Sequence, residues 1–221
     1  MLAKTHMESI KQTYRLFLQN NFAGLKLRKP LFYSWDYGLR FDLQDKKLKT
    51  SDDEYFAEAV RRAAEIFETV FAGSDRIIFV FMDYKWRRRK IRHTNYAFRQ
   101  IDNLDKSEIF YTKEASVYYQ NDAFNFALIK LTADRINYKN ILTAIAHSDF
   151  SPRRPRLDNY GMFTDKAIFF FNLDKKLIFH MYDDRGLDVI AADKEILRPI
   201  YKKHNDLILD YDRERIDKQF K

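Results

Sequence analysis

The chain has 221 residues, of which 46% are hydrophobic and 16% aromatic, a composition that excludes global disorder. It contains no cysteine, which excludes a disulfide framework, a zinc–thiolate site and a cysteine nucleophile. The formal net charge is +8, and no apolar run has the length of a signal peptide or a membrane span. We therefore expect a single domain over residues 1–221, located in the cytoplasm and without a membrane partner.

The first 82 residues predict two helices and two strands. Thr5, followed by Glu8, has the pattern of a capping box, and the apolar spacing after it predicts a helix that ends at Gly24. Alternating apolar residues over 37–43 predict a half-buried strand. A second capping box, at Ser51, opens a helix.

Gly73 is the expected C-cap of this second helix. The uninterrupted apolar run from Ile77 to Met82 then predicts a central strand that is covered on both faces. The middle of the chain predicts two further strands, Glu108–Thr112 and Phe124–Leu131, with a short helix capped by Asn137 after them. Pro152 and Pro155 then predict an extended conformation for residues 151–156.

The last third predicts a β-meander and closing helices. Two apolar runs between residues 167 and 182 flank a tight turn, and a third run follows Gly186. Asp193 starts the closing helical region, where Pro199 either kinks a helix or occupies the first turn of one that begins at Arg198. The order of elements predicts an α+β fold with a largely antiparallel sheet, helices packed on it, and helices at both ends.

Three stretches carry a resemblance to a known family. They are WDYGLRFDL at 35–43, AIFFFNLDKKLIFHMYDDRGLDVIA at 167–191 and IYKKHNDLILDYDRERID at 200–217. Together they resemble the uncharacterised bacterial family called domain of unknown function 3885. The resemblance covers most of the chain and implies no activity for any residue.

The positive charge is concentrated in two segments. Residues 85–99 hold seven Lys and Arg and no acid, and residues 151–156 hold three more, so the remainder of the chain has a small negative charge. Trp86, Tyr96 and Phe98 lie among the cations, and exposed aromatics beside cations suit unpaired bases and phosphates. The predicted polyanion-binding residues are Lys85, Trp86, Arg87, Arg88, Arg89, Lys90, Arg92, Arg153, Arg154 and Arg156. Two alternatives remain: a solvated loop with Trp86 packed into the core, or a positive rim that pairs with the chain's own acidic face.

Several classes of site lack their residues. The five glycines are too scattered for a phosphate-binding loop, and the five histidines lack helical metal-site spacing, so we expect no cofactor, no metal and no catalytic residue. One cluster deserves a test, because His180 precedes Asp183, Asp184 and Asp188 and these groups suit a hydrolase or nuclease. A turn capped by its own aspartates explains the same residues.

Two non-enzymatic functions fit the sequence. The first is a binding protein that engages a polyanion, either nucleic acid or an acidic protein surface, through the basic segments. The alternative is an immunity-type interaction module that inhibits a toxin through an edge or a face of its sheet.

Overall fold

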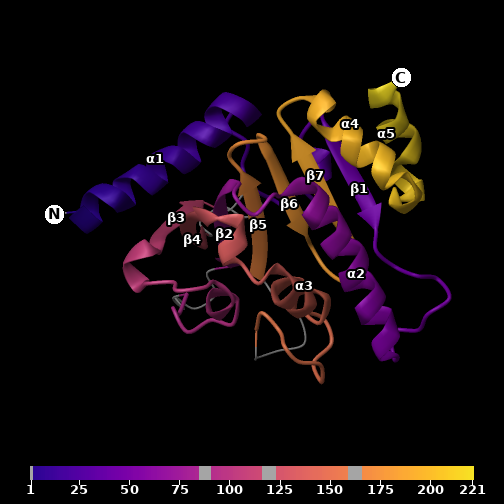
Figure 1. Ribbon diagram of the computed structural model, residues 1–221, viewed down its shortest axis with the longest axis horizontal. Helices are drawn as coiled ribbons and strands as arrows, with labels where there is room; N and C mark the ends of the chain where they lie inside the picture. Colours follow the sequence, from indigo (N-terminus) through magenta and orange to yellow (C-terminus); the bar gives the residue numbers. More distant parts are fainter. Residues whose placement is uncertain (1, 85–90, 116–122, 159–165) are drawn as a thin grey trace.

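Seven strands form one antiparallel sheet in the computed structural model, which describes residues 2–84, 91–115, 123–158 and 166–221 (Figure 1). The strand order is β1-β7-β6-β5-β2-β4-β3. The predicted meander is confirmed, because β5, β6 and β7 are neighbours in sequence and in the sheet. The strands are β1 (Gly38–Asp42), β2 (Arg76–Tyr84), β3 (Phe110–Ala115), β4 (Ala123–Thr132), β5 (Lys166–Asn172), β6 (Leu177–Met181) and β7 (Gly186–Ala191).

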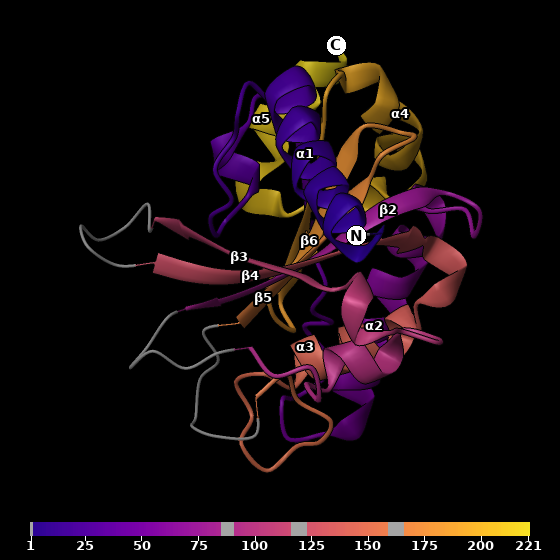
Figure 2. The ribbon, with the colours of Figure 1, turned by 90° about the vertical axis from the view of Figure 1, so that its left-hand side faces the viewer.

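Helices cover both faces of this sheet, which confirms the α+β class. On one face lies the larger core, to which α2, α3, α4 and α5 contribute, and α1 packs on the other face (Figures 1 and 2). The helices are α1 (Leu2–Phe22), α2 (Asp53–Val70), α3 (Tyr138–Ala146), α4 (Lys194–Lys203) and α5 (Arg213–Phe220).

The central strand β2 contributes side chains to the cores on both faces of the sheet. Its side chains alternate between the faces, and every residue from 77 to 82 is buried because both faces are covered. Full burial of an apolar side chain of this size contributes about 1.5–3 kcal/mol. The two sets are Ile77, Phe79 and Phe81 in the larger core, and Ile78, Val80 and Met82 under α1.

Three predicted helix boundaries are wrong. The first helix begins at Leu2, so Thr5 lies inside it, although Gly24 does follow its end with a φ of +74°. The second helix has Asp52 rather than Ser51 before its first residue, and its first-turn acids favour the helix N-terminus electrostatically. It ends at extended Phe71, whose N–H donates to Phe67 O at 2.8 Å, before the chain reaches Gly73.

The caps of the later helices are confirmed. Asn137 accepts a hydrogen bond from Asn140 N, and Asp193 accepts one from Glu195 N. Pro199 lies well inside α4, so the alternative in which that helix begins at Arg198 is wrong.

The predicted extended conformation of residues 151–156 is wrong as well. The segment folds back in turns and bends, and Arg153 N donates to Phe150 O at 2.9 Å. The third strand also begins later than predicted, because Glu108 belongs to a short 3-10 helix that Asp105 caps.

Four neighbouring strands, β5, β2, β4 and β3, have termini at the same end of the sheet. Tyr84 pairs with Phe124, and Asp83 pairs with Lys166. The last residue of β2, the first residues of β4 and β5 and the last residue of β3 are therefore close together, as Figure 2 shows. None of the helices in the described residues has the length and apolar character that a membrane crossing requires.

Candidate functional site

The two basic segments lie next to each other where the structure describes them. Asn95 Nδ2 donates to Leu157 O at 3.5 Å, so the first segment contacts the residue that follows the second. Arg92 is exposed. The predicted residues Lys85, Trp86, Arg87, Arg88, Arg89 and Lys90 lie outside the described residues.

The two described aromatic residues of the first segment, Tyr96 and Phe98, contribute little stacking surface. Phe98 is 2% exposed and packs edge-on against Phe79, so it belongs to the core. Tyr96 is half-buried, and burial raises the pKa of its hydroxyl. Phe98 therefore offers no stacking platform for a base, and Tyr96 offers only part of its ring.

The three arginines of the second segment have three different environments. Arg156 is 2% exposed and donates to Ser148 O, so it belongs to the interior rather than to a binding surface. Arg153 pairs with Asp53 at 2.6 Å and stacks over the ring of Phe56, 3.9 Å from its centroid. Arg154 is exposed, and its guanidinium donates to two backbone carbonyls of its own turn at 2.6 and 2.7 Å.

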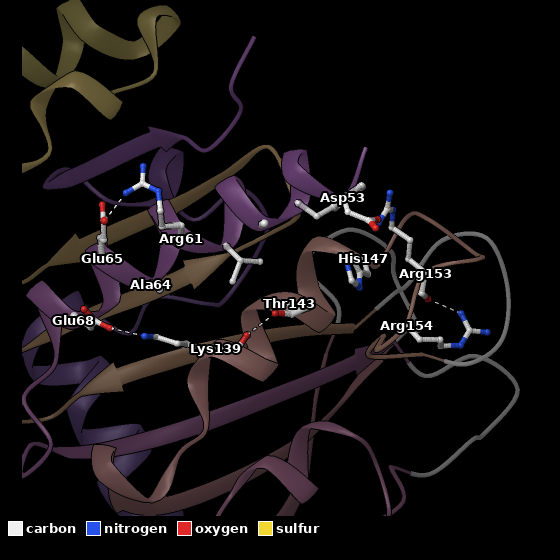
Figure 3. A pocket seen from close by; sticks show the side chains of 13 residues that line it. Asp53, Arg61, Ala64, Glu65, Glu68, Lys139, Thr143, His147, Arg153 and Arg154 are labelled. Atoms are coloured by element: carbon white, nitrogen blue, oxygen red, sulfur yellow. Dashed lines mark hydrogen bonds and ion pairs between the residues drawn. The ribbon is translucent and has the colours of Figure 1, made fainter. Parts of the chain in front are cut away.

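Arg153 and Arg154 border a groove of about 780 Å³ along α2 and α3 (Figure 3). The floor of the groove is apolar, because α2 presents small and apolar side chains at helical spacing. Its floor residues are Phe56, Ala57, Val60 and Ala64. Hydrophobic contacts are therefore available here beside charged groups.

Charge differs between the two ends of this groove (Figure 3). At one end Arg61 pairs with Glu65 at 2.5 Å and Lys139 pairs with Glu68 at 3.3 Å. At the other end Arg154 has no carboxylate partner among the described residues. The groove therefore has one neutralised end and one cationic end.

His147 adds no charge to the cationic end at neutral pH. It is 8% exposed, and its Nδ1 lies 3.1 Å from Pro155 O. Burial lowers the pKa of the imidazole, with a further contribution from Arg153. The positive potential at this end therefore comes from Arg154, since Asp53 neutralises Arg153.

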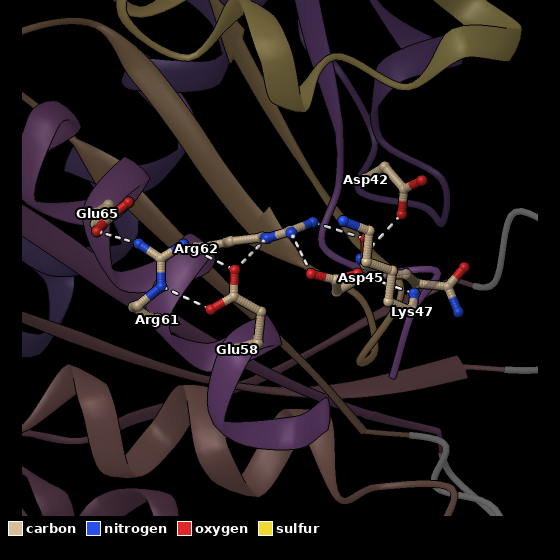
Figure 4. A network of polar contacts seen from close by, with 8 residues as sticks. Asp42, Asp45, Lys47, Glu58, Arg61, Arg62 and Glu65 are labelled. Carbon is tan, nitrogen blue, oxygen red and sulfur yellow. Dashed lines mark hydrogen bonds and ion pairs between the residues drawn. The ribbon is translucent and has the colours of Figure 1, made fainter. Parts of the chain in front are cut away.

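On the neighbouring turn of α2, charged side chains form a network in which they pair with one another (Figure 4). Glu58 accepts from Arg61 and from Arg62, both at 2.7 Å, and these contacts lower the pKa of Glu58 to about 2. Arg62 also donates to Gln44 O at 2.6 Å, which ties the loop after β1 to α2. These charges stabilise the local fold and leave none unmatched for a ligand.

The predicted cluster around His180 converges only in part, because His180 lies opposite Asp188 in the sheet while Asp183 and Asp184 have other partners. His180 is fully buried, its Nδ1 lies 2.8 Å from Ile168 O, and burial lowers its pKa to about 3. Asp183 pairs with Arg185 and accepts from its backbone N–H at 2.8 Å, as expected for a capped turn. Asp184 accepts from Tyr55 Oη of α2 at 2.6 Å. No group of three metal-binding side chains occurs in the part of the chain that the structure describes.

Arg40 joins Asp188 and His180 in the sheet, and sequence reasoning missed this residue. In the register, His180 lies opposite Asp188, which lies opposite Arg40, so the three side chains form a row across β6, β7 and β1. Asp188 is fully buried, its Oδ2 accepts from Phe32 N at 3.0 Å, and burial raises the pKa of the carboxyl to about 6. The alternation of β1 placed Arg40 on its polar side, which was the available signal.

Arg40 also borders a second, smaller opening. Its guanidinium donates to Tyr182 Oη at 3.3 Å and lies between the rings of Tyr33 and Tyr182. The opening has a volume of about 330 Å³. Its lining residues are Lys29, Pro30, Arg40, Asp149, Tyr182, Asp183 and Arg185.

The three stretches that carry the family resemblance meet at Arg40. Arg40 lies in the first, Tyr182 and Asp188 lie in the second, and Asp212 in the third lies 3.9 Å from Arg40 Nε. The model of the family described as "Domain of unknown function (DUF3885)" matches residues 14–212. The chain belongs to this family.

A similar protein is known in Bacillus subtilis (strain 168). The chain is 26% identical over 209 residues to "Uncharacterized protein YnaE", and the match covers 88% of this chain and 96% of that protein. No solved structure is significantly similar to the chain.

Proposed function

We propose that this DUF3885 protein is a non-enzymatic binding protein that holds an acidic, amphipathic segment of a partner protein in the groove along α2 and α3. The observation that carries the proposal is the pairing of an apolar floor with one cationic end. The partner's acidic groups would lie beside Arg154, and its apolar side chains would cover Phe56 and Val60.

The floor favours a protein partner over nucleic acid. Phosphates gain nothing from burying Ala57, Val60 and Ala64, whereas apolar side chains gain about 25 cal/mol for each Å² removed from water. The burial of Phe98 points the same way, because it withdraws one stacking surface that unpaired bases would use.

The different charges at the two ends of the groove set the direction in which the partner's segment would lie. Glu65 and Glu68 are neutralised by Arg61 and Lys139, so that end attracts no strong charge of either sign. Arg154 is held by backbone carbonyls, and an arginine fixed in this way loses less conformational entropy when it pairs with a carboxylate.

The free edge of the sheet, which lies outside the groove, favours a second candidate function. β3 is an edge strand of the sheet, and among the described residues it pairs only with β4. Tyr111 on this strand is 43% exposed. A partner that adds a strand here would suit an immunity-type inhibitor of a toxin.

The test uses a helical peptide of Leu and Glu with an apolar stripe, a scrambled peptide of the same composition, and a single-stranded oligonucleotide. We expect saturable binding of the striped peptide, at least fivefold weaker binding of the scrambled peptide, and weaker affinity at high salt. Fluorescence anisotropy measures all three probes.

The matched variants are Arg153→Ala/Arg154→Ala and, as the control, Arg198→Ala. Arg198 pairs with Glu195 at 2.6 Å, as Arg153 pairs with Asp53, and it lies outside the groove. The double variant should weaken peptide binding by about tenfold and the control should not. Tighter binding of the oligonucleotide than of the peptide, or equal loss in the control, would overturn the proposal.

A further inference from the structure

Arg40 forms two long ion pairs, and neither of them uses one of its hydrogen-bond donors. Its side chain is 15% exposed, and its Nε lies 3.7 Å from Asp188 Oδ1 and 3.9 Å from Asp212 Oδ2, both beyond hydrogen-bond distance. The guanidinium carbon lies 5.1 Å from the ring centroid of Tyr33 and 5.2 Å from that of Tyr182. Two tyrosine rings thus fix its orientation.

Beside Arg40, the opening contains the hydroxyl of Tyr182, which can donate a hydrogen bond. Tyr182 Oη accepts from Nε and Nη2 of Arg40, at 3.4 and 3.3 Å. Because its oxygen already accepts from the guanidinium, the phenolic proton is directed to another acceptor. Burial raises the pKa of Tyr182 to about 12, so this proton is present at neutral pH.

Further cations complete the lining of the opening. Lys29 and Arg185 join Arg40, and Arg185 carries an ion pair with Asp183 that holds both groups at the opening. The volume of about 330 Å³ far exceeds the roughly 30 Å³ that one water molecule occupies. It accommodates an oxyanion together with a small organic group.

We propose that this opening is a binding site for a phosphate group carried by a small molecule, with Arg40 and Tyr182 as the principal donors and Lys29 and Arg185 at its rim. A planar guanidinium binds phosphate through two parallel hydrogen bonds. A phosphate monoester presents three terminal oxygens to these donors, whereas a carboxylate presents two, so phosphate can use more of them. The site is independent of the groove along α2 and α3.

The two acids of the lining, Asp149 and Asp183, favour phosphate over sulfate. A carboxylate repels a fully ionised anion, but it accepts a hydrogen bond from a phosphate that retains a proton, as inorganic phosphate does at neutral pH and a phosphate monoester does below about pH 6. Sulfate retains no proton over this range. Burial and the neighbouring Asp183 raise the pKa of Asp149, which therefore shares a proton more readily than an exposed aspartate.

The experiment is a titration of the full chain with inorganic phosphate, with sulfate and acetate as parallel arms. Isothermal calorimetry should give saturable phosphate binding, with sulfate and acetate at least tenfold weaker. In 15N NMR, phosphate should shift the Arg40 Nε signal and the amides of residues 182–186. An absence of saturable phosphate binding, or equal binding of sulfate, would overturn the site as proposed.

Three variants separate this site from a general attraction of the positive chain. Arg40→Gln should weaken phosphate binding by at least tenfold, and Tyr182→Phe by about fivefold. Arg185→Ala should weaken it about threefold, whereas Arg76→Ala should have no effect. The last pair is matched, because the side chains of Arg185 and Arg76 are 62% and 65% exposed and each pairs with one aspartate.

Arg40→Gln can lose its fold, so circular dichroism and a thermal melt accompany each variant. If Arg40→Gln is unfolded, Tyr182→Phe and Arg185→Ala decide, since the first removes one hydroxyl and the second a mostly exposed side chain. Equal phosphate affinity in these two variants and in Arg76→Ala would contradict the proposal.

Discussion

The two openings of this protein differ in what surrounds their arginines. In the groove along α2 and α3, Arg153 and Arg154 lie beside an apolar floor and near the surface. In the smaller opening, Arg40 is 15% exposed and is surrounded by phenols, carboxylates and other cations. The same side chain therefore meets different ligand chemistry, an amphipathic protein segment in the first and a phosphate in the second.

This difference shows that the number of cations in a sequence segment does not predict which of them a ligand can reach. Of the three arginines in residues 151–156, one is buried and one is paired with Asp53. Arg40 lies in a strand with no excess of cations, yet it has no carboxylate within hydrogen-bond distance. Tertiary packing decides which cations face open space.

The largest expected effect is that of Gly186→Ala, which should disrupt the smaller opening and leave the groove open. A Cβ at this position would lie 2.7 Å from Phe41 O and would collide with the hydroxyl of Tyr182. We expect a loss of unfolding free energy of about 2–3 kcal/mol, because backbone cannot yield at β1. Urea denaturation measures the loss.

Gly73→Ala is the matched control, because its Cβ would make an ordinary contact of 3.4 Å with Asp134. It should change stability by less than about 0.5 kcal/mol. Equal losses in the two variants would show that the opening has more room than the structure indicates.

The second prediction concerns the carboxyl beside Arg40. The pKa of Asp188 is about 6 in the folded chain, above the roughly 3.9 of an unfolded aspartate, so the folded state binds more protons between these values. This residue therefore costs stability as pH rises from about 4 to about 6. Relative to Asp188→Asn, the wild type should lose on the order of 2 kcal/mol over that window.

Urea unfolding at pH 4, 5, 6 and 7 tests this difference, with the exposed Asp36→Asn as the control. The difference between wild type and Asp188→Asn should grow with pH, whereas that for Asp36→Asn should be nearly constant. A flat difference for Asp188→Asn would mean that the carboxyl is solvated.

The third prediction separates the two arginines of the groove. Arg153→Ala removes the stacking on Phe56 and the ion pair with Asp53, and should cost about 1 kcal/mol. Arg154→Ala removes only contacts with backbone carbonyls of its own turn, so its cost should be a few tenths of a kcal/mol. Thermal unfolding of both variants checks the order, and the reverse order would contradict the assignment of Arg154 to binding.

The smallest expected effect is that of Glu58→Gln. The arginines around Glu58 lower its pKa to about 2, so its contribution to stability is present above about pH 4.5 and is lost as pH falls toward 2. Exposure of the pair reduces the contribution to less than about 1 kcal/mol at neutral pH. Unfolding at pH 7 and pH 3 should show a smaller difference at pH 3, with the exposed Glu54→Gln as control.

Local patterns predicted most of the fold. The alternation over 37–43, the apolar run at 77–82 and the caps at Asn137 and Asp193 act through neighbours in sequence, and the structure confirms them. The boundaries at Thr5, Ser51 and Gly73 were wrong, because several nearby residues can end or begin a helix at similar cost.

The candidate sites could not be predicted in the same way. The groove depends on the packing of α2 against α3 and on a turn at 151–153, which sequence reasoning expected to be extended. The cluster at Arg40 depends on the pairing of β1 with β7, strands about 150 residues apart in the chain. Long-range register of this kind has no signature in a single sequence.

One measurement tests most directly whether the two openings have different ligands. The 15N-labelled chain is titrated with the striped Leu/Glu peptide in the absence and presence of saturating inorganic phosphate. We predict that the peptide shifts amides of Ala57, Val60 and Thr143 to the same extent in both conditions, while phosphate shifts the Arg40 Nε signal and Gly186. Competition between the two probes, or shifts of the same residues by both, would contradict the account.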